Sequence, residues 1–197
     1  MAKRLFDIIF SFLGLILVLP LLLLLAVLIK RELPGPVFYR GVRIGKGGRL
    51  FRIFKFRSMV ENAEELGGPS TAGDDPRLTK IGKFLKKYQL DELPQLINVL
   101  RGEMSLVGPR PEIKMYVEMM TNEERNVILS IKPGMTDLAS LWNFHESEVL
   151  KGSPDPEKTY QEKIRPQKIK LQLEYVKNRS FLLDLKIIIK TVLKIFQ

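Results

Sequence analysis

The longest hydrophobic run of the chain is residues 8–29, which contain 22 consecutive uncharged positions. As an α-helix this run would be about 33 Å long, close to the thickness of the hydrocarbon core of a bilayer. The run is longer than the core of a typical signal peptide, and no small-residue cleavage motif follows it. The pattern therefore predicts a retained membrane segment, with a buried helix of a soluble protein as the alternative.

Pro20 lies just past the middle of this run, where it removes a backbone hydrogen bond and predicts a kink. Basic residues flank both ends, Lys3 and Arg4 before the run and Lys30 and Arg31 after it. Positive charge prefers the cytoplasmic side, so neither end is marked as the outer one. We expect a re-entrant helix that enters and leaves by the same face, although the residues alone leave a full span open.

Two short β-prone runs, residues 37–40 and 50–56, flank a turn of glycines and one lysine at residues 45–48. This arrangement predicts a β-hairpin. Lys55 and Arg57 are two residues apart and would share a face of a strand, where they are suited to hold phosphate. A solvated edge, or one that faces lipid headgroups, is the alternative.

Further helices are predicted from apolar residues at helical spacing. A basic amphipathic helix over residues 77–90 starts at Asp75-Pro76, and its character suits a membrane surface or a protein core. In the last helix, lysines recur every fourth residue and apolar side chains cover the rest, which predicts a helix in the membrane interface or one that docks a partner protein. The other predicted helices are residues 112–120, 122–131, 163–177 and 181–196, with a turn at residues 132–134 and loops at residues 64–75 and 147–156.

Residues 90–111 combine the features most suited to catalysis. Asp91 and Glu92 are adjacent, Pro94 follows, and a glycine-proline turn carries Arg110. Proline is favoured in the first turn of a helix, which places both carboxylates near a helix N-terminus, where the dipole favours their ionised form. An ionised aspartate is a competent nucleophile, and a neighbouring carboxylate suits a Mg²⁺ ion. Simple compensation of the helix dipole is the alternative.

Composition narrows the function classes. The absence of cysteine excludes disulfides, thiol catalysis and cysteine metal sites, and His145 as the single histidine argues against a histidine metal cluster. The formal net charge of +10 indicates an anionic partner. A nucleic-acid-binding protein has no use for a 22-residue apolar segment, so we expect lipid or a phosphorylated substrate and no nucleic acid.

In these stretches the chain resembles the small monotopic phosphoglycosyl transferases, bacterial sugar transferases that start glycan assembly on polyprenol phosphate. The resemblance covers nearly the whole chain, including its hydrophobic N-terminal segment. Its longest and most specific block is the stretch that holds Asp91, Glu92 and Arg110. The matching stretches are residues 55–59, 91–96, 98–100, 105–111, 132–134 and 175–186.

The resemblance implies an α+β, mostly α fold in one functional unit. Residues 1–31 would form a re-entrant membrane helix, broken near Pro20, and residues 32–197 a catalytic domain on the cytoplasmic face of the bacterial inner membrane. A small β-hairpin and interfacial amphipathic helices complete the expected fold. The implied partners are a UDP-sugar, polyprenol (undecaprenyl) phosphate and membrane lipids, with a homodimer possible.

The implied reaction has two steps. Asp91 would attack the β-phosphate of the UDP-sugar and release UMP, and polyprenol phosphate would then take the phosphosugar from Asp91. The resemblance makes Asp91 and Glu92 the catalytic pair and the ligands of a Mg²⁺ cofactor. It makes Arg110, with Lys55, Arg57 and Lys132 as weaker candidates, the residues that bind substrate phosphates. For Lys132, an ordinary lysine at the C-terminus of a helix is the alternative.

Two features of the sequence depart from the family pattern. Relatives commonly have glycine and glutamine at the positions of Asp137 and Ser140, and a serine at the position of Leu19 before the proline. The first departure bears on sugar specificity and the second on the kink angle. The other functions considered are a catalytically inactive membrane scaffold of the same fold and a basic peripheral lipid-binding module. Which sugar is transferred, and in which glycan pathway, stays open.

Overall fold

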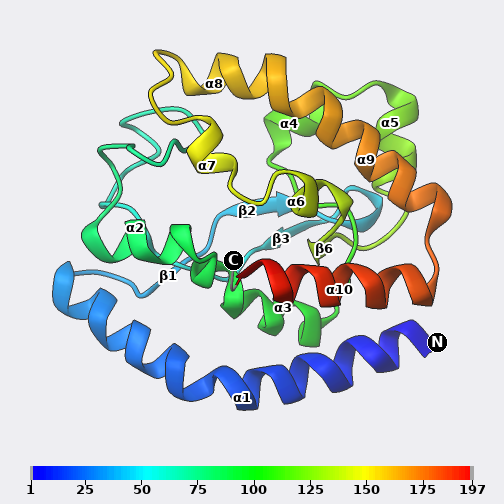
Figure 1. Cartoon of the computed structure of the whole chain (residues 1–197), viewed down its shortest axis with the longest axis horizontal. Coiled ribbons are helices and arrows are strands. Elements are labelled where there is room, and N and C mark those ends of the chain that lie inside the picture. Colours follow the sequence, from blue (N-terminus) through cyan, green and yellow to red (C-terminus); the bar gives the residue numbers. More distant parts are fainter. Residues whose placement is uncertain (1, 196–197) are drawn as a thin grey trace.

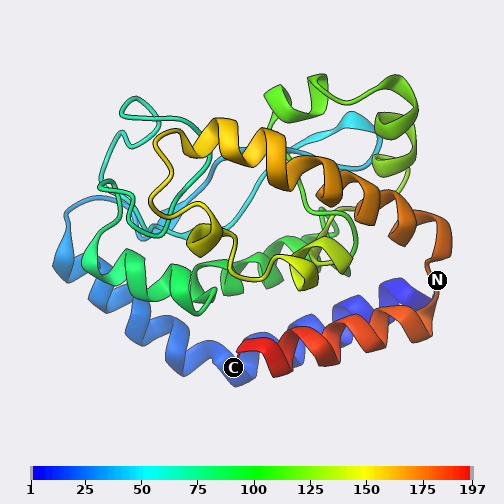
Figure 2. The same cartoon turned by 45° about the horizontal axis from the view of Figure 1, so that its top comes forward.

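The computed structural model describes residues 2–195, so residue 196 at the end of the last predicted helix lies outside the described residues. Figures 1 and 2 show three layers. One layer holds the two apolar helices, α1 (Ala2–Glu32) and α10 (Phe181–Ile195), which lie side by side over part of their length. The middle layer holds short helices and strands, and α9 (Arg165–Asn178) crosses the opposite side. The α+β, mostly helical fold class expected from the sequence is confirmed.

Helix α1 is continuous through Pro20 and is bent near its middle (Figure 1). Proline removes one backbone hydrogen bond and crowds the preceding turn, which accounts for a bend without an interruption. The expected break at Pro20 is therefore a bend within one helix. In the part of the chain that the structure describes, α1 is the one helix long and apolar enough to cross a membrane.

Both ends of α1 are fastened to the rest of the chain. Near its N-terminus, Arg4 donates to the carbonyls of Val99 and Leu100 at 2.6 and 2.9 Å, and the Asp7 carboxylate accepts hydrogen bonds from Ser105 and Leu106. At its C-terminus, the Glu32 carboxylate accepts from the backbone N–H groups of Lys80 and Ile81 at 2.6 and 3.0 Å. The helix thus contacts the same folded body at both ends.

The predicted hairpin is confirmed, but it is divided into two ladders. Strands β2 (Val42–Ile44) and β3 (Leu50–Arg52) pair around the short 3₁₀ helix Lys46–Gly48, and β1 (Phe38–Tyr39) pairs with β4 (Lys55–Phe56). Both pairs are antiparallel. A third pair, β5 (Ser105–Val107) and β6 (Gly134–Thr136), is parallel. Strand β4 contains Lys55, and β5 leads into the turn that carries Arg110.

The helix expected over residues 77–90 begins later than Asp75-Pro76 predicts. Helix α2 runs from Lys80 to Lys87, and Thr79 caps it by accepting from the Gly82 N–H. Asp75 instead forms a buried ion pair with Arg77, at 2.7 Å, whose guanidinium also holds the carbonyls of the preceding loop. The Asp75 carboxylate accepts from both the backbone N–H and the guanidinium of Arg77, so it closes a local turn and does not cap a helix.

The remaining elements are α4 (Lys114–Glu118), α5 (Asn122–Ile128), α6 (Leu138–Trp142), α7 (Glu146–Val149), α8 (Pro156–Thr159) and the π-helix η3 (Tyr160–Ile164). Helices α4 and α5 follow two predicted helices with shorter bounds, whereas α6, α7 and α8 were not predicted. The loop expected over residues 147–156 begins inside a short helix, and a π-helical turn precedes α9.

Helix α10 packs on the body through apolar side chains, with Ile187 fully buried, and through a few polar contacts. Its buried Asp184 accepts a hydrogen bond from the Tyr175 hydroxyl and pairs with Lys3 of α1. Lys194 donates to the carbonyl of Leu141, so one lysine of the predicted stripe faces the protein. The exposed large apolar residues of the helix are Phe181, Leu182, Leu185, Ile189, Val192 and Leu193.

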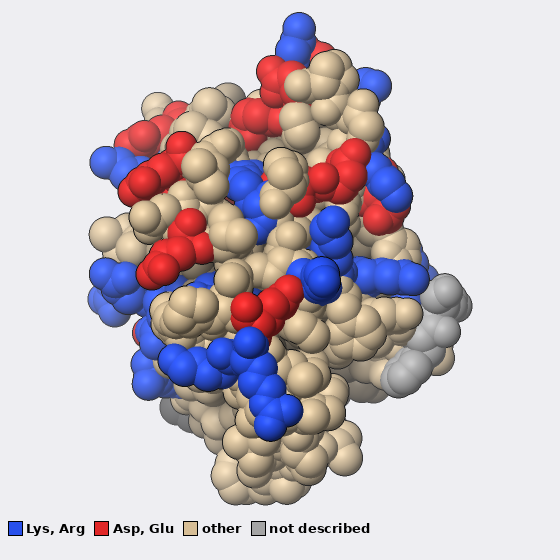
Figure 3. All heavy atoms as spheres, turned by 90° about the vertical axis from the view of Figure 1, so that its left-hand side faces the viewer, with Lys and Arg blue, Asp and Glu red and all other residues tan. Residues whose placement is uncertain are grey.

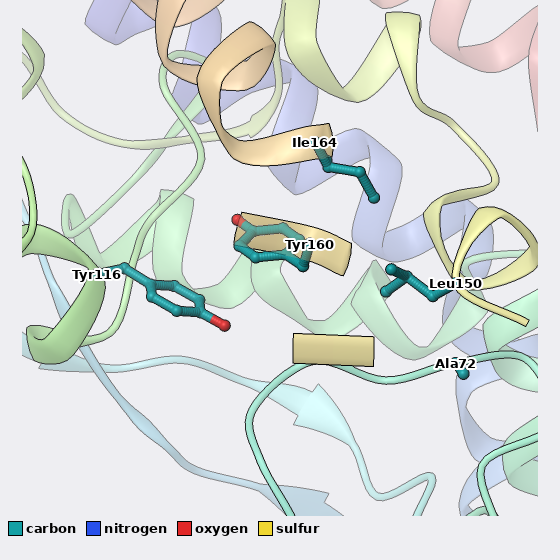
Figure 4. Packing of buried hydrophobic residues seen from close by; sticks show 5 residues of the cluster. All are labelled: Ala72, Tyr116, Leu150, Tyr160 and Ile164. Atoms are coloured by element: carbon teal, nitrogen blue, oxygen red, sulfur yellow. The ribbon is translucent and has the colours of Figure 1, made fainter. Parts of the chain in front are cut away.

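An aromatic cluster anchors the layer opposite α1. Tyr160 is central in this cluster, and its ring stacks on Tyr116 with centroids 5.2 Å apart (Figure 4). Leu150 and Ile164 fill the other side, and Ala72 joins them from the long loop before α2. The cluster fixes η3 and the end of α7 beside the candidate site.

Candidate active site

The predicted carboxylate pair lies in the first turn of a 3₁₀ helix, η2 (Leu90–Gln95), which leads directly into α3 (Leu96–Arg101). Gln89, just before it, has a left-handed backbone with φ of 53°. Such a conformation is uncommon for a residue other than glycine, and it turns the chain sharply between α2 and η2. The turn places Asp91 and Glu92 at a helix start, as the sequence predicts.

Glu92 holds two cations. Its carboxylate accepts from Lys55 Nζ at 2.7 Å and from both terminal nitrogens of Arg110, one of them at 2.9 Å. The strand pair β1–β4 supplies Lys55, and the turn after β5 supplies Arg110. Burial favours the neutral acid, but the charges of Arg110 and Lys55 outweigh it and hold the pKa of Glu92 well below its usual range. Glu92 is therefore ionised at neutral pH.

Asp91 differs from its neighbour. Asp91 is 4% exposed, and within residues 2–195 its carboxylate forms no hydrogen bond and no ion pair. Burial raises the pKa of Asp91, while the charges of Lys55 and Lys86 oppose this shift. A buried carboxylate without a donor is costly for stability, and such a group is a candidate for chemistry.

Arg110 is held by a tight crossing of two backbones. A Cβ on Gly134 would lie 2.0 Å from the backbone nitrogen of Gly108, so this approach of β6 to the turn after β5 requires glycine. Asp137 then links the two segments from the side. Its fully buried carboxylate accepts from the N–H of Arg110 at 3.3 Å and from the N–H and hydroxyl of Ser140 at 2.7 and 2.8 Å.

We expect Asp137→Ala to destabilise the protein by about 1–3 kcal/mol, because α6 loses its cap and the Arg110 N–H loses an acceptor. Asp137→Asn keeps one acceptor oxygen and should cost less. Chemical denaturation with both variants measures the difference. An alanine variant as stable as the parent would contradict the linking role of this carboxylate.

A pocket has Gln89, just before η2, and Arg110, the partner of Glu92, in its wall. Lys168 of α9 also lines it. Lys168 pairs with Glu112 at 2.7 Å and donates to the Tyr160 hydroxyl at 2.9 Å. Burial lowers the pKa of Lys168, but the Glu112 charge outweighs burial and raises it above its usual range. Glu112 therefore compensates the positive charge of Lys168, and this lysine is already paired within the protein.

The structure does not bring all the predicted phosphate-binding residues together. Arg57 lies beyond the end of β4 and donates to the carbonyls of Leu33 and Pro34, where it fastens the end of α1. The amino group of Lys132 lies beside Gly102, at the end of α3, and near Arg4 of α1. Lys55 and Arg110 share the site with Asp91 and Glu92, whereas Arg57 and Lys132 lie elsewhere.

Sequence reasoning missed several residues of this region. Gln89 carries no signal for a left-handed turn. Glu112 follows the Arg110 turn, but its partner Lys168 is 56 positions away, so the pair became visible only in three dimensions. Asn143 and Glu146, which line the pocket, lie beside Trp142 and His145, for which the sequence favours local packing over ligand binding.

The site is compatible with Mg²⁺ if the substrate supplies further ligands. Within residues 2–195, no group of three or more histidine or acidic side chains is placed to hold a metal ion. Mg²⁺ bound to phosphorylated substrates often takes only one or two protein carboxylates. Among the described residues no cation pairs with the Asp91 carboxylate, whereas Glu92 is engaged by Lys55 and Arg110. Among the described residues, Asp91 thus offers a free carboxylate to a metal ion, whereas Glu92 would have to share its oxygens between the ion and its two cationic partners.

Comparisons with known proteins match the chain over nearly its whole length. The family described as Bacterial sugar transferase matches residues 1–197. A UDP-N-acetylgalactosamine-undecaprenyl-phosphate N-acetylgalactosaminephosphotransferase of Aeromonas hydrophila is 39% identical over 195 residues, which cover 96% of this chain and 42% of that protein. A UDP-glucose:undecaprenyl-phosphate glucose-1-phosphate transferase of Klebsiella pneumoniae is 41% identical over 199 residues, 98% of this chain and 40% of that protein.

A third relative has a similar length. The exopolysaccharide production protein PSS of Rhizobium leguminosarum bv. phaseoli is 37% identical over 202 residues, which cover 96% of this chain and 92% of that protein. The chain therefore spans about two fifths of the first two relatives and nearly all of the third. The candidate site lies within the shared region in each case, since the match covers almost the whole chain.

Proposed function

Because this chain belongs to the bacterial sugar transferase family, we propose that it transfers a sugar 1-phosphate from a UDP-sugar to undecaprenyl phosphate. The names of two relatives describe this transfer with different sugars. The observation that carries the proposal is the pairing of one free, buried carboxylate, Asp91, with a neighbour that holds two cations, Glu92. This arrangement suits attack on a phosphate.

The proposed reaction proceeds in two displacements. An oxygen of the Asp91 carboxylate attacks the β-phosphorus of the UDP-sugar, and the bond from that phosphorus to the bridging oxygen breaks, so UMP leaves. A phosphate oxygen of undecaprenyl phosphate then attacks the same phosphorus. The bond to Asp91 breaks, the carboxylate is restored, and the product is an undecaprenyl diphosphate sugar. Each step exchanges one phosphorus–oxygen bond for another.

The surrounding charges support this attack by an anion on an anion. Arg110 and Lys55 lie beside Asp91 and are suited to bind the diphosphate oxygens, Arg110 in a bidentate manner. Glu92 keeps both cations in place before substrate arrives. Asp91 and Glu92 would hold Mg²⁺, which would neutralise charge on the diphosphate. Substrate phosphates compete with Glu92 for the two cations, which frees the Glu92 oxygens.

We place the layer of α1 and α10 in the membrane. Figure 3 shows an uncharged protrusion at the bottom with lysine and arginine side chains gathered above it. Such a boundary between apolar and basic surface suits the headgroup region of an anionic bilayer. The exposed basic residues at the end of α1 and on α2 are Lys30, Arg31, Lys80, Lys83 and Lys87. The large apolar residues that α1 exposes are Leu5, Ile8, Ile9, Phe10, Phe12, Leu13, Ile16, Leu17, Leu19, Leu21, Leu23, Leu24 and Val27.

The anchoring of both α1 ends supports re-entry. A straight helix that crosses the bilayer carries its ends to opposite sides, whereas Arg4 and Asp7 at one end and Glu32 at the other contact the same body. The bend in α1 brings both ends toward that body (Figure 1). This arrangement would place the catalytic domain and both helix ends on the cytoplasmic face of the inner membrane.

Single cysteines at the two ends of α1 are expected to react from the cytoplasmic side only. The chain has no natural cysteine, so Ala2→Cys and Arg31→Cys each provide one exposed thiol. A charged maleimide added to intact spheroplasts should label neither, and inverted vesicles should label both. Leu17→Cys, at an 82% exposed apolar position, should resist the charged reagent in both preparations because lipid covers it. Labelling of either end from outside would contradict re-entry.

The transfer itself is tested with purified protein in detergent. Radiolabelled UDP-sugars, Mg²⁺ and undecaprenyl phosphate are supplied together, and label in the organic phase is measured. We expect label to enter the lipid with at least one sugar, and UMP, not UDP, to accumulate in equal amount. Release of UDP would contradict phosphosugar transfer, because it would mean that the sugar alone was moved.

A further inference from the structure

The pocket beside Arg110 is lined by several polar side chains. It lies between α6, the start of α7 and the Gln89 turn, and its lining includes Gln89, Arg110, Ser140, Asn143 and Glu146. The indole of Trp142, from a residue 47% exposed, forms part of the rim. The pocket therefore continues from the phosphate-binding arginine into a wall of hydrogen-bonding side chains.

Two of these groups lack a partner in the protein. The Asn143 Nδ2 atom is buried, and no acceptor lies within hydrogen-bonding distance of it in the described chain. The Glu146 carboxylate forms no ion pair or side-chain hydrogen bond within residues 2–195, and its charge helps to raise the pKa of Arg110 and of Lys168. A side-chain amide without a partner is costly, so an unpartnered amide and an unpartnered carboxylate on two residues that line one pocket indicate a polar ligand.

The pocket wall is held firmly by other contacts. The Gln89 side-chain amide donates to the carbonyl of Phe144, which ties the turn before Asp91 to the segment after α6. Asp137 caps α6 through Ser140, and Lys168 is compensated by Glu112. The free groups of Asn143 and Glu146 thus stand on a framework whose own polar atoms are satisfied, as in a preformed binding site.

The chemistry of the lining fits a sugar ring. Hydroxyl groups both donate and accept hydrogen bonds, so a free amide N–H and a free carboxylate satisfy them together. The C–H face of a pyranose packs on an aromatic ring, and Trp142 offers such a face at the rim. In a UDP-sugar the sugar is joined directly to the β-phosphate, while the uracil lies beyond the α-phosphate and the ribose. A pocket that has Arg110 in its wall, with Arg110 paired to Glu92 beside the attacking Asp91, is thus next to the sugar.

We propose that this pocket binds the sugar ring of the UDP-sugar donor, and that Trp142, Asn143 and Glu146 determine which sugar is accepted. The proposal rests on the proposed function for the identity of the donor. It assigns Ser140, one of the two positions that depart from the family pattern, to the wall of the sugar site, and Asp137 to its support.

Binding measurements separate the sugar from the nucleotide. Dissociation constants of UDP and of UDP-glucose, UDP-galactose, UDP-N-acetylglucosamine and UDP-N-acetylgalactosamine are measured by calorimetry for the full chain in detergent. Asn143→Ala and Trp142→Ala are compared with Asn126→Ala, an exposed asparagine on α5. We expect the first two variants to bind the preferred UDP-sugar at least about fivefold more weakly and UDP within about twofold of the parent, with the control unchanged.

Parallel loss of UDP and UDP-sugar affinity would overturn the proposal, because the pocket would then hold the nucleotide. Unchanged affinity for every UDP-sugar in both variants, or no binding of any of them by the parent protein, would overturn it as well. Because Trp142 is half exposed, its truncation is a second test should Asn143→Ala not fold. Sugar-selective weakening in a protein that transfers nothing would uphold the pocket and refute the proposed reaction.

Discussion

Replacing Asp91 by asparagine is expected to reduce transfer by about 10³-fold or more, because an amide is a poor nucleophile and no covalent phosphosugar forms. The two side chains have nearly the same shape, so the surroundings of this buried residue should be kept. UMP release from a UDP-sugar in the presence of undecaprenyl phosphate measures the effect. Glu65→Gln, which removes an exposed carboxylate elsewhere, is the matched control and should transfer normally.

The same substitution should leave the free energy of unfolding at pH 7 unchanged or larger. Burial raises the pKa of Asp91, so the folded protein binds this proton more tightly than the unfolded chain does. The stability that Asp91 contributes is then fully present below its unfolded pKa and is lost as the pH rises through its folded pKa. Asparagine removes the cost of the buried charge. An inactive but equally stable variant supports a catalytic role, and normal turnover would refute it.

Glu92→Gln is expected to lower both stability and activity. Lys55 and Arg110 keep their charges but lose the carboxylate that compensates them, and breaking such a buried pair costs roughly 3–5 kcal/mol. Transfer should fall by about 10²-fold because Arg110 is no longer oriented toward the phosphates. The half-saturating Mg²⁺ concentration should rise if Glu92 also binds the ion. Urea denaturation and a Mg²⁺ titration of UMP release measure the two effects.

The pH dependence of stability gives this prediction a definite sign. Arg110 and Lys55 hold the pKa of Glu92 well below its usual range, so its contribution is fully present above the ordinary glutamate pKa and is lost as the pH falls toward the lower folded value. The stability difference between parent and variant should be constant near pH 7 and shrink in acid. The double variant Lys55→Met, Glu92→Gln should regain part of the loss. An unaltered Mg²⁺ titration would argue against Glu92 as a ligand.

Local patterns predicted much of the framework of the site. The hairpin before Lys55, the helix start at Asp91 and Glu92, and the glycine-proline turn at Arg110 follow from turn residues and proline placement, which act over a few positions. The apolar run of α1 was equally plain. The contacts that join these segments connect residues far apart in the sequence. Lys55 meets Glu92 across 37 positions, and Arg110 meets it across 18, and no spacing rule predicts such pairs.

The errors have similar causes. Arg57 follows Lys55 by two residues, but β4 ends at Phe56, so the two side chains do not continue along one strand and Arg57 binds carbonyls at the end of α1. Asp75 looked like a helix cap, yet Arg77 engages its carboxylate. In both cases a local pattern was overridden by a partner that lay nearby in space. The role of Asp137 as a link between α6 and the Arg110 turn was visible only once both segments were placed.

The most direct measurement of the central claim is the intact mass of the purified protein after incubation with the four UDP-sugars and Mg²⁺, without undecaprenyl phosphate. The account predicts a mass increase equal to one phosphosugar with the preferred donor, lost on addition of undecaprenyl phosphate and absent from Asp91→Asn. An adduct that persists in Asp91→Asn would contradict this account of the chemistry. So would lipid product formed by a protein that never carries the phosphosugar.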